Sequence, residues 1–559
     1  MNRLLLLLSL VLILGSCQKK AEKPIIDYKT IWVDSIYSKM TLEEKVGQLF
    51  MVAAYSNRDS THTNSINKMI TENHLGGLVF FQGGPVRQAK LTNHFQALSK
   101  IPLMISIDAE WGLSMRLDST PSIPFNMTLG AITDNSIINK LGKQLGRNCK
   151  RMGIHVNFAP VVDINTNPKN PIIGVRSFGE DKYNVSKKAI AFTKGMQSEG
   201  VLACAKHFPG HGDTATDSHK TLPTVSFDAQ RIDSVELYPF KQVFKNGMAS
   251  VMVAHLNVPS LEPVDGLPSS LSYKITTELL KEKLNYKGLI FTDALNMKGA
   301  ANFGEPGAID LLAFKAGNDV LLFSEDAPKA ISLIVEAYQK KEISEERLAH
   351  SVKKILASKY KVGLNNYQPI ELENLVADLN TTADKELYKE TIEKAITIIK
   401  NENQLLPIAK DSTRNIVLIS LGDGDNASFL NALKAEIKTT VLDKSQYQKI
   451  KKKALVLISY HRKNARKTNL ISNEDTQIIE KISKNHQVIF VDFASLYSAS
   501  NILFSNIEVA IIAYENSGIS QKVTAEIILG MTDAKGKLPA SINNEFKTGL
   551  GLEFITQHN

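Results

Sequence analysis

The 559-residue sequence predicts an α/β protein with a (β/α)₈ barrel of the TIM type followed by a smaller α/β domain. Three observations support this fold class. Eight short apolar runs alternate with amphipathic helical stretches between residues 28 and 365. These runs are apolar on both faces, which is typical of parallel strands covered by helices. After a polar connector, further apolar runs alternate with helical stretches, which indicates a second α/β unit.

The N-terminal residues predict an export signal and a lipid anchor. A short positive start precedes the apolar run Leu4–Leu14, which is too short to span a bilayer but suits a signal peptide over residues 1–16. The run ends in Leu14-Gly15-Ser16-Cys17, which resembles a bacterial lipobox. We therefore expect Cys17 to be acylated and residues 17–27 to form a tether. The alternative is an ordinary signal peptide with an incidental cysteine.

The barrel is predicted over residues 28–365. Thr41-Leu42-Glu43-Glu44 has the pattern of a helix capping box. The expected strands, in chain order, are Gln48–Ala54, Gly77–Gln82, Leu103–Asp108, His155–Asp163, Ala203–His207, Ser250–His255, Gly288–Asp293 and Asp319–Phe323. Eight such units fit the usual size of a closed barrel.

Many of these runs end in polar residues. They are Asp108 and Glu110, Asp163, Lys206 and His207, His255 and Asn257, and Asp293. In a TIM barrel all strand ends of this kind meet at one mouth, where active sites lie. Burying so many polar groups without a function would be costly, so the pattern predicts a shared functional pocket.

Residues 366–385 read as a polar linker, and residues 386–559 as the smaller domain. Its expected strands are Ile416–Leu421, Ala454–Ser459, Val488–Asp492 and Val509–Tyr514. The domain has no dense cluster of catalytic residue types.

Charge and cysteine content exclude some classes of protein. The net charge of +9 is modest for this length and nothing indicates nucleic-acid binding. A basic run between Lys449 and Lys467 reads as a solvated face, with attraction to an anionic cell-wall or membrane surface as the alternative. Cys149 and Cys204 read as small buried hydrophobic residues rather than a disulfide, and neither has metal-ligand spacing.

The segment from Lys206 to His219 is the richest in reactive side chains. It holds three histidines, two aspartates and a lysine, and its glycines and proline exclude a regular helix. One interpretation is a metal site made by His207, His211, Asp213 and His219, although their spacing matches no standard zinc pattern. The other is acid–base chemistry, because Asp217 and His219 project to one side of an extended loop and a carboxylate orients an imidazole. A satisfied loop histidine is the structural alternative.

Asp293 follows the apolar run Gly288–Thr292 at the position where a barrel places catalytic groups. A carboxylate there suits attack on the anomeric carbon of a sugar, because it can form a glycosyl ester. The alternative is that Asp293 caps the following helix.

These stretches together resemble glycoside hydrolase family 3, and specifically its β-N-acetylglucosaminidase branch. The resemblance is carried by Lys206-His207-Phe208-Pro209-Gly210-His211-Gly212 with Asp217-Ser218-His219, by Thr292-Asp293, by Ile107-Asp108-Ala109-Glu110, and by Asn157–Asp163 followed by Arg176-Ser177-Phe178. Lys400–Pro407 and Gly530–Pro539 resemble the family's second domain, an α/β sandwich. The resemblance covers nearly the whole mature chain.

The resemblance implies a role for each matching residue. Asp293 is expected to be the nucleophile, and His219, oriented by Asp217, the acid/base. Asp108, Arg176, Lys206 and His207 are expected to bind the sugar. No metal and no organic cofactor is implied. Two residues depart from the family pattern, Ala294 after the nucleophile and Trp111 where a glycine is common.

The expected function is that of a retaining exo-β-N-acetylglucosaminidase acting on a glycan that contains N-acetylglucosamine. The anchor suggests a lipoprotein of the cell envelope, at an outer membrane and facing the periplasm, where peptidoglycan fragments are the natural substrates. The rival hypotheses are an N-acetylglucosaminide phosphorylase, a β-glucosidase-type exo-glycosidase, and a non-catalytic glycan-binding lipoprotein. No sequence feature indicates an oligomeric state.

Overall fold

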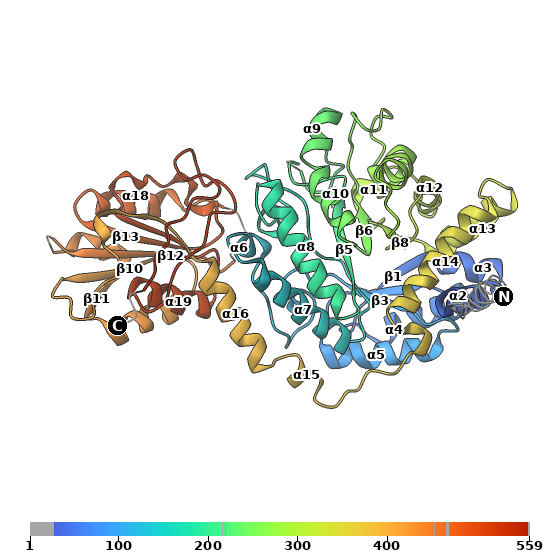
Figure 1. Cartoon of the computed structure of the whole chain (residues 1–559), viewed down its shortest axis with the longest axis horizontal. Helices are drawn as coiled ribbons and strands as arrows, with labels where there is room; N and C mark the ends of the chain where they lie inside the picture. Colours follow the sequence, from blue (N-terminus) through green and yellow to red (C-terminus); the bar gives the residue numbers. More distant parts are fainter. Residues whose placement is uncertain (1–26, 215, 219, 452, 465–468, 557–559) are drawn as a thin grey trace, which may run out of the picture.

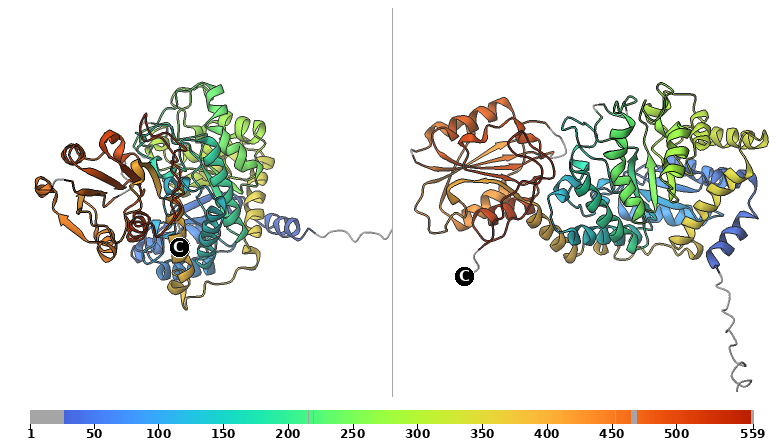
Figure 2. Two further views of the ribbon diagram at one scale, coloured as in Figure 1. Left: turned by 60° about the vertical axis from the view of Figure 1, so that its left-hand side comes forward. Right: turned by 45° about the horizontal axis from the view of Figure 1, so that its top comes forward.

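The computed structural model describes residues 27–556, except 215, 219, 452 and 465–468. The predicted signal peptide and Cys17 therefore lie outside the described residues. Across the described ranges, every helix is too short or too polar to cross a bilayer. Two domains lie side by side, the first coloured from blue to yellow and the second from orange to red (Figures 1 and 2).

The first domain is the predicted eight-stranded parallel barrel. Its strands are adjacent in the order β7-β6-β5-β4-β3-β2-β1-β8. A parallel bridge from Phe291 to Val320 and a 3.0 Å hydrogen bond from Thr292 N to Val320 O join β7 to β8 and close the cylinder. The strands are β1 (Phe50–Ala54), β2 (Gly77–Phe80), β3 (Met104–Ile107), β4 (Val156–Asn157), β5 (Leu202–Phe208), β6 (Ser250–Val253), β7 (Leu289–Thr292) and β8 (Leu321–Leu322).

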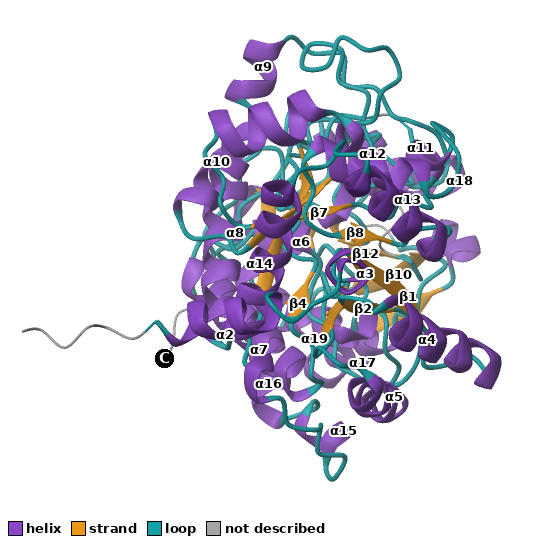
Figure 3. Ribbon diagram, turned by 90° about the vertical axis from the view of Figure 1, so that its right-hand side faces the viewer, coloured by secondary structure: helices purple, strands orange, loops and turns teal. Residues whose placement is uncertain are grey.

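Helices surround these strands on the outside (Figure 3). They are α2 (Tyr28–Tyr37), α3 (Leu42–Gly47), α4 (Ser60–Asn73), α5 (Pro85–Leu98), α6 (Asn126–Gly130), α7 (Asn135–Arg151), α8 (Lys182–Ser198), α9 (Ala229–Ser234), α10 (Leu237–Lys245), the π-helix η4 (Lys274–Lys283), α11 (Lys298–Ala301), α12 (Ala308–Ala316), α13 (Ala327–Gln339) and α14 (Glu345–Lys361). The predicted capping box is present at α3, where Thr41 Oγ1 accepts from Glu44 N and Glu44 Oε2 accepts from Thr41 N. Satisfying both amides stabilises the first turn of that helix.

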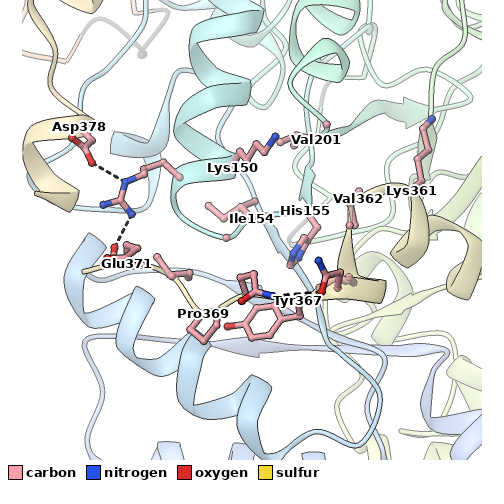
Figure 4. A pocket seen from close by; sticks show the side chains of 18 of the residues that line it. Lys150, Ile154, His155, Val201, Lys361, Val362, Tyr367, Pro369, Glu371 and Asp378 are labelled. Carbon is pink, nitrogen blue, oxygen red and sulfur yellow. Dashed lines mark hydrogen bonds and ion pairs between the residues drawn. The ribbon is translucent and has the colours of Figure 1, made fainter. Parts of the chain in front are cut away.

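The connector between the domains runs beneath the barrel, at the N-terminal ends of its strands. It contains α15 (Leu375–Asp378) and leads into α16 (Thr382–Ala395). Arg151 holds this segment through hydrogen bonds to Asp378 Oδ2 at 2.8 Å, Glu371 O at 2.7 Å and Glu373 O at 2.8 Å (Figure 4). The guanidinium fork thus binds three acceptors of one irregular segment.

The second domain is an α/β sandwich around a six-stranded sheet in the order β11-β10-β12-β13-β14-β9. Its strands are β9 (Thr397–Asn401), β10 (Ile416–Gly422), β11 (Thr439–Leu442), β12 (Leu455–His461), β13 (Gln487–Phe493) and β14 (Val509–Ile512). Helices α18 (Asn473–Ser483) and α19 (Gly518–Ile528) cover opposite faces, and α17 (Ala427–Glu436) packs beside α19 (Figure 1).

The four strands expected in this domain are present, and two more were not expected. β11 is an edge strand whose side chains are half or fully exposed, so it lacks the pattern of a buried strand. β9 pairs antiparallel with β14 and is separated from α16 by Ile396 alone, so its apolar residues read as part of the helix.

Several direct contacts join the domains. Asn165 Nδ2 donates to Tyr497 Oη at 2.8 Å, Lys537 N to Ala131 O at 2.9 Å, and Ser541 Oγ to Glu180 Oε1 at 2.6 Å. In the barrel core, Cys149 and Cys204 are buried free thiols, as expected.

Candidate active site

A cavity of about 540 Å³ opens at the C-terminal ends of the barrel strands. Its polar lining includes Arg176 and five of the eight predicted strand-end residues, namely Asp108, Glu110, Lys206, His207 and Asp293. The other three, Asp163, His255 and Asn257, do not line this cavity. Its apolar lining is aromatic and aliphatic, with Tyr55, Phe81, Trp111, Phe158, Met252 and Phe323. A lining that combines convergent polar groups with aromatic side chains is typical of a site that binds a small polar ligand.

Asp108, directly after β3, is held by two cations. Lys206 Nζ lies 2.8 Å from Asp108 Oδ1, and Arg116 Nη2 lies 2.9 Å from Oδ2. Burial would raise the pKa of this carboxyl, but Lys206 and Arg116 outweigh burial and hold the pKa below its usual value. Asp108 is therefore an ionised hydrogen-bond acceptor at the cavity wall.

Glu110 lies two residues further on, is buried, and accepts from two cations. The Arg176 guanidinium donates from Nε to Oε2 at 2.8 Å and from Nη2 to Oε1 at 2.7 Å, and Lys206 Nζ lies 2.7 Å from Oε1. Burial is the largest influence and opposes ionisation, but Arg176 and Lys206 lower the pKa of Glu110 far below its usual value. Glu110 thus fixes the two cations that face the cavity.

The neighbours of His207 determine which of its ring nitrogens carries the proton. Its Nδ1 lies 2.7 Å from Asp163 Oδ2, and its Nε2 lies 3.2 Å from Arg176 Nη2. Since the guanidinium can only donate, Nε2 must accept and Nδ1 must carry the proton that is donated to Asp163. Asp163 is fully buried and also accepts from the backbone amides of His207 and His211.

Asp293 stands at the C-terminal end of β7. Its backbone amide bonds to Val253 O on β6 at 2.8 Å, and its Oδ1 accepts from Ala294 N at 2.8 Å. Burial raises the pKa of this carboxyl, but the donors and cations around it, including the Ala294 amide and Lys206, lower the pKa by a larger amount, so the net shift is downward. Asp293 is an ionised carboxylate facing the cavity.

The helix-cap alternative for Asp293 is wrong. The next helix, α11, begins at Lys298 and has Met297 at its N-cap. The loop between Asp293 and α11 is instead fixed by His255, whose Nε2 donates to Ala294 O at 2.9 Å and whose Nδ1 accepts from Ser270 Oγ at 2.7 Å. The backbone N–H and C=O of Ala294 make all of its contacts here, and these require no particular side chain.

The loop after β5 contributes His211 and Ser218 to the lining of the cavity. His211 Nδ1 donates to Thr214 Oγ1 at 2.6 Å, and His211 Nε2 accepts from Ser218 Oγ at 3.1 Å. Ser218, which separates Asp217 from His219 in the sequence, lines the cavity. Asp217 is partly buried, and His219 lies outside the described residues.

Three of the four residues of the metal alternative, all but His219, which lies outside the described residues, have other partners. Both ring nitrogens of His207 and of His211 are engaged, and Thr166 Oγ1 donates to Asp213 Oδ1 at 2.9 Å. Among the residues that the structure describes, no three histidine, cysteine or acidic side chains form a group that could hold a metal ion.

Three residues of the site make contacts that the sequence does not predict. Glu110 and Asp163 were visible as polar strand ends, but their partners were not. Arg116 was missed: it follows a 3₁₀ turn, its guanidinium carbon lies 3.9 Å from the centre of the Phe81 ring, and it bonds to Asp108. Trp111 lines the cavity and packs edge-on against Phe125 at 5.3 Å.

Residues 41–358 match the model of the glycosyl hydrolase family 3 N-terminal domain. Beta-hexosaminidase A of Pseudoalteromonas piscicida is 28% identical over 549 residues, which cover 86% of this chain and 91% of that protein. A beta-N-acetylglucosaminidase/beta-glucosidase of Cellulomonas fimi is 26% identical over 401 residues, 70% of each chain.

A solved structure is similar over both domains. The glycoside hydrolase family 3 beta-N-acetylglucosaminidase from Paenibacillus sp. str. FPU-7 superposes with a TM-score of 0.75 at 30% sequence identity. The match covers 90% of this chain and 99% of that one.

Proposed function

Because this chain belongs to glycoside hydrolase family 3, in its β-N-acetylglucosaminidase branch, we propose that it is a retaining exo-enzyme that removes terminal β-linked N-acetylglucosamine from glycans. The enzyme is a glycoside hydrolase of the β-N-acetylhexosaminidase class. The observation that supports the retaining reaction is that Asp293, an ionised carboxylate at the end of β7, lines the active-site cavity. Ser218, which lies between Asp217 and His219 in the sequence, lines the same cavity.

In the first step an Asp293 carboxylate oxygen attacks C1 of the bound sugar. A C1–O(Asp293) bond forms as the glycosidic C1–O bond breaks, and protonated His219 gives its proton to the departing oxygen. Because Asp293 is already ionised, no proton has to leave the nucleophile before attack.

In the second step water attacks C1 of the glycosyl ester. His219 removes a proton from this water, the C1–O(Asp293) bond breaks, and the Asp293 carboxylate is regenerated. Two inversions at C1 retain the β-configuration. In this scheme Asp217 stabilises the imidazolium form of His219.

The four predicted sugar-binding residues supply complementary hydrogen bonds. The Asp108 carboxylate accepts from sugar hydroxyls, while Lys206 and Arg176 donate to hydroxyl oxygens. The ion pair of Lys206 with Asp108, and the pairs of Lys206 and Arg176 with Glu110, hold three of these residues in place before substrate arrives, so less ordering is required on binding. His207 is fixed beside them by Asp163.

We further propose that the protein is a lipoprotein attached through Cys17 and that its natural substrates are peptidoglycan fragments. The lipobox-like Leu14–Cys17 sequence supports the anchor. An envelope location facing the periplasm would put the cavity in contact with cell-wall fragments.

The experiment is chromogen release from an aryl β-N-acetylglucosaminide by protein lacking residues 1–17, with the aryl β-glucoside in parallel. The Cellulomonas relative carries both activities in its name, so the glucoside decides between the aminosugar and the β-glucosidase function. Selective release from the aminosugar, abolished in Asp293→Ala and kept in Asp265→Asn on the surface, supports the proposal. Release from the glucoside alone, or from neither substrate, contradicts it.

Adding inorganic phosphate and assaying sugar 1-phosphate separates hydrolysis from phosphorolysis.

A further inference from the structure

A groove of about 1060 Å³ lies at the end of the barrel opposite the active-site cavity. Its lining includes Leu202, Ala249 and Gly288, which stand at or just before the N-terminal ends of β5, β6 and β7. The active-site residues stand at the C-terminal ends of the same strands. The two openings therefore face away from each other along the barrel axis.

The groove is lined by seven lysines and no carboxylate: Lys29, Lys241, Lys245, Lys283, Lys287, Lys354 and Lys361. Two of them are neutralised, because Lys241 pairs with Asp233 at 2.7 Å and Lys354 with the buried Asp319 at 2.7 Å. The other five are exposed, and within the described chain none of these five is in an ion pair. A concave surface that carries one sign of charge focuses its field and attracts an anionic surface.

The lysines come from four separate elements, α2, α10, the η4 region and α14. Figure 3 shows α10, α14 and α2 along one side of the barrel. The adjacent cavity beneath the connector shares Lys361, but there Arg151 is paired with Asp378, and Glu371 and Glu373 are also present (Figure 4). The excess of positive charge is therefore confined to the lysine groove and does not extend over the whole face at the N-terminal ends of the barrel strands.

The start of the described chain lies at this groove. Helix α2 begins at Tyr28, and Lys29 is one of the lining residues. Cys17, the predicted lipidation site, precedes α2 by about ten residues, which span at most ~35 Å when extended. An anchor at Cys17 would therefore keep the groove close to a bilayer.

We propose that the lysine groove docks the barrel on an anionic lipid surface, so that the active-site cavity faces away from the membrane toward soluble glycan. Lysines near an anionic leaflet each contribute to attraction, and the contribution falls with salt. The inference goes beyond the proposed reaction and does not depend on it, because lipid binding is measured without turnover.

The test is co-flotation with vesicles by protein lacking residues 1–17, which keeps every described helix and strand of both domains. The vesicles are phosphatidylcholine alone, or phosphatidylcholine and phosphatidylglycerol in equal amounts. We expect binding only to the anionic vesicles at low salt. The variant Lys245→Gln/Lys283→Gln/Lys287→Gln/Lys361→Gln should lower the partition coefficient at least about ten-fold.

The matched control removes four exposed lysines of the second domain, Lys449→Gln/Lys451→Gln/Lys453→Gln/Lys484→Gln, and should bind as the parent does. An equal loss in both variants would attribute binding to net charge, and a loss in the control alone would assign docking to the second domain. Either result, or no binding by the parent, overturns the proposal. Unchanged aryl-glycosidase activity or melting temperature shows that the groove variant is folded, and the double variant Lys283→Gln/Lys287→Gln provides a milder test.

Discussion

The Arg176 guanidinium holds the Glu110 carboxylate through two parallel hydrogen bonds of 2.7 and 2.8 Å. The pair joins the segment after β3 to the 3₁₀ turn that ends at Arg176, 66 residues further along the chain. Both side chains are largely buried, and Lys206 completes the cluster. Glu110 therefore orients two proposed sugar-binding cations and is best described as a positioning residue.

The first prediction concerns Glu110→Gln. The amide keeps the shape of the carboxylate but leaves Arg176 without its counter-charge at this position and Lys206 with Asp108 alone. Removing one partner of a buried ion pair costs about 3–5 kcal/mol of stability. We expect KM to rise and kcat/KM to fall about 10–100-fold, together with a lower melting temperature. Asp118→Asn, which breaks the exposed 2.7 Å pair with Arg87, should change neither by much. Unaltered kinetics in Glu110→Gln would refute the positioning role.

The second prediction concerns the tautomer of His207. In Asp163→Asn the new amide can present an N–H group to His207 Nδ1, while Arg176 continues to donate to Nε2. Both ring nitrogens then face N–H donors, and the nitrogen that carries the ring proton has no acceptor. We expect kcat/KM to fall at least about ten-fold, measured on the aryl aminosugar. Asp213→Asn makes the same change at a partly buried loop residue bonded to Thr166 and should retain most activity. Comparable losses in both variants would contradict the tautomer argument.

The third prediction tests His219 as the acid. General acid catalysis contributes about 10²–10⁴-fold, and a good leaving group needs little of it. His219→Gln should therefore lose much more activity on an alkyl than on a dinitrophenyl aminosugar, and Asp217→Asn should show the same trend more weakly. Asp293→Ala should lose activity equally on both substrates. An equal loss for both leaving groups in His219→Gln would exclude the acid role.

The fourth prediction concerns pH and His211. Burial, with a contribution from His207, lowers the pKa of His211 from 6.5 to about 4. Between these values the unfolded chain binds a proton that the folded protein does not, so stability is lost as the pH falls from about 6.5 to about 4. The loss is at most about 3 kcal/mol.

Melting temperatures between pH 7 and pH 4.5 measure this effect. The decline should be smaller in His211→Gln than in the parent protein, whereas His94→Gln, at an exposed position on α5, should decline as the parent does. Parallel curves for all three proteins would show that His211 does not contribute.

Much of the fold was readable because it depends on local pattern. Each barrel strand is a short run buried on both faces, and seven of the eight predicted ranges agree with the observed strands to within two residues at each end. The exception is His155–Asp163, which was predicted too long, because β4 ends at Asn157. The strands that were missed, β9 and β11, lack that pattern: one continues from a helix and the other is an exposed edge. The hydrophobic pattern of a sequence indicates which segments are buried, so it cannot detect an exposed edge strand such as β11. It also cannot separate a buried strand such as β9 from the helix that directly precedes it.

The sequence by itself determined which side chains stand at the strand ends, because a parallel barrel places every strand's C-terminal end at one mouth. It also determined the family, through the Lys206–His219 and Thr292-Asp293 motifs. Only the tertiary structure decided the partners: Glu110 with Arg176, Asp163 with His207, Arg116 with Asp108, and the lysines that share one groove. These contacts join residues that are distant along the chain, and their distances depend on how the barrel closes and on where its loops pack, which no local pattern specifies.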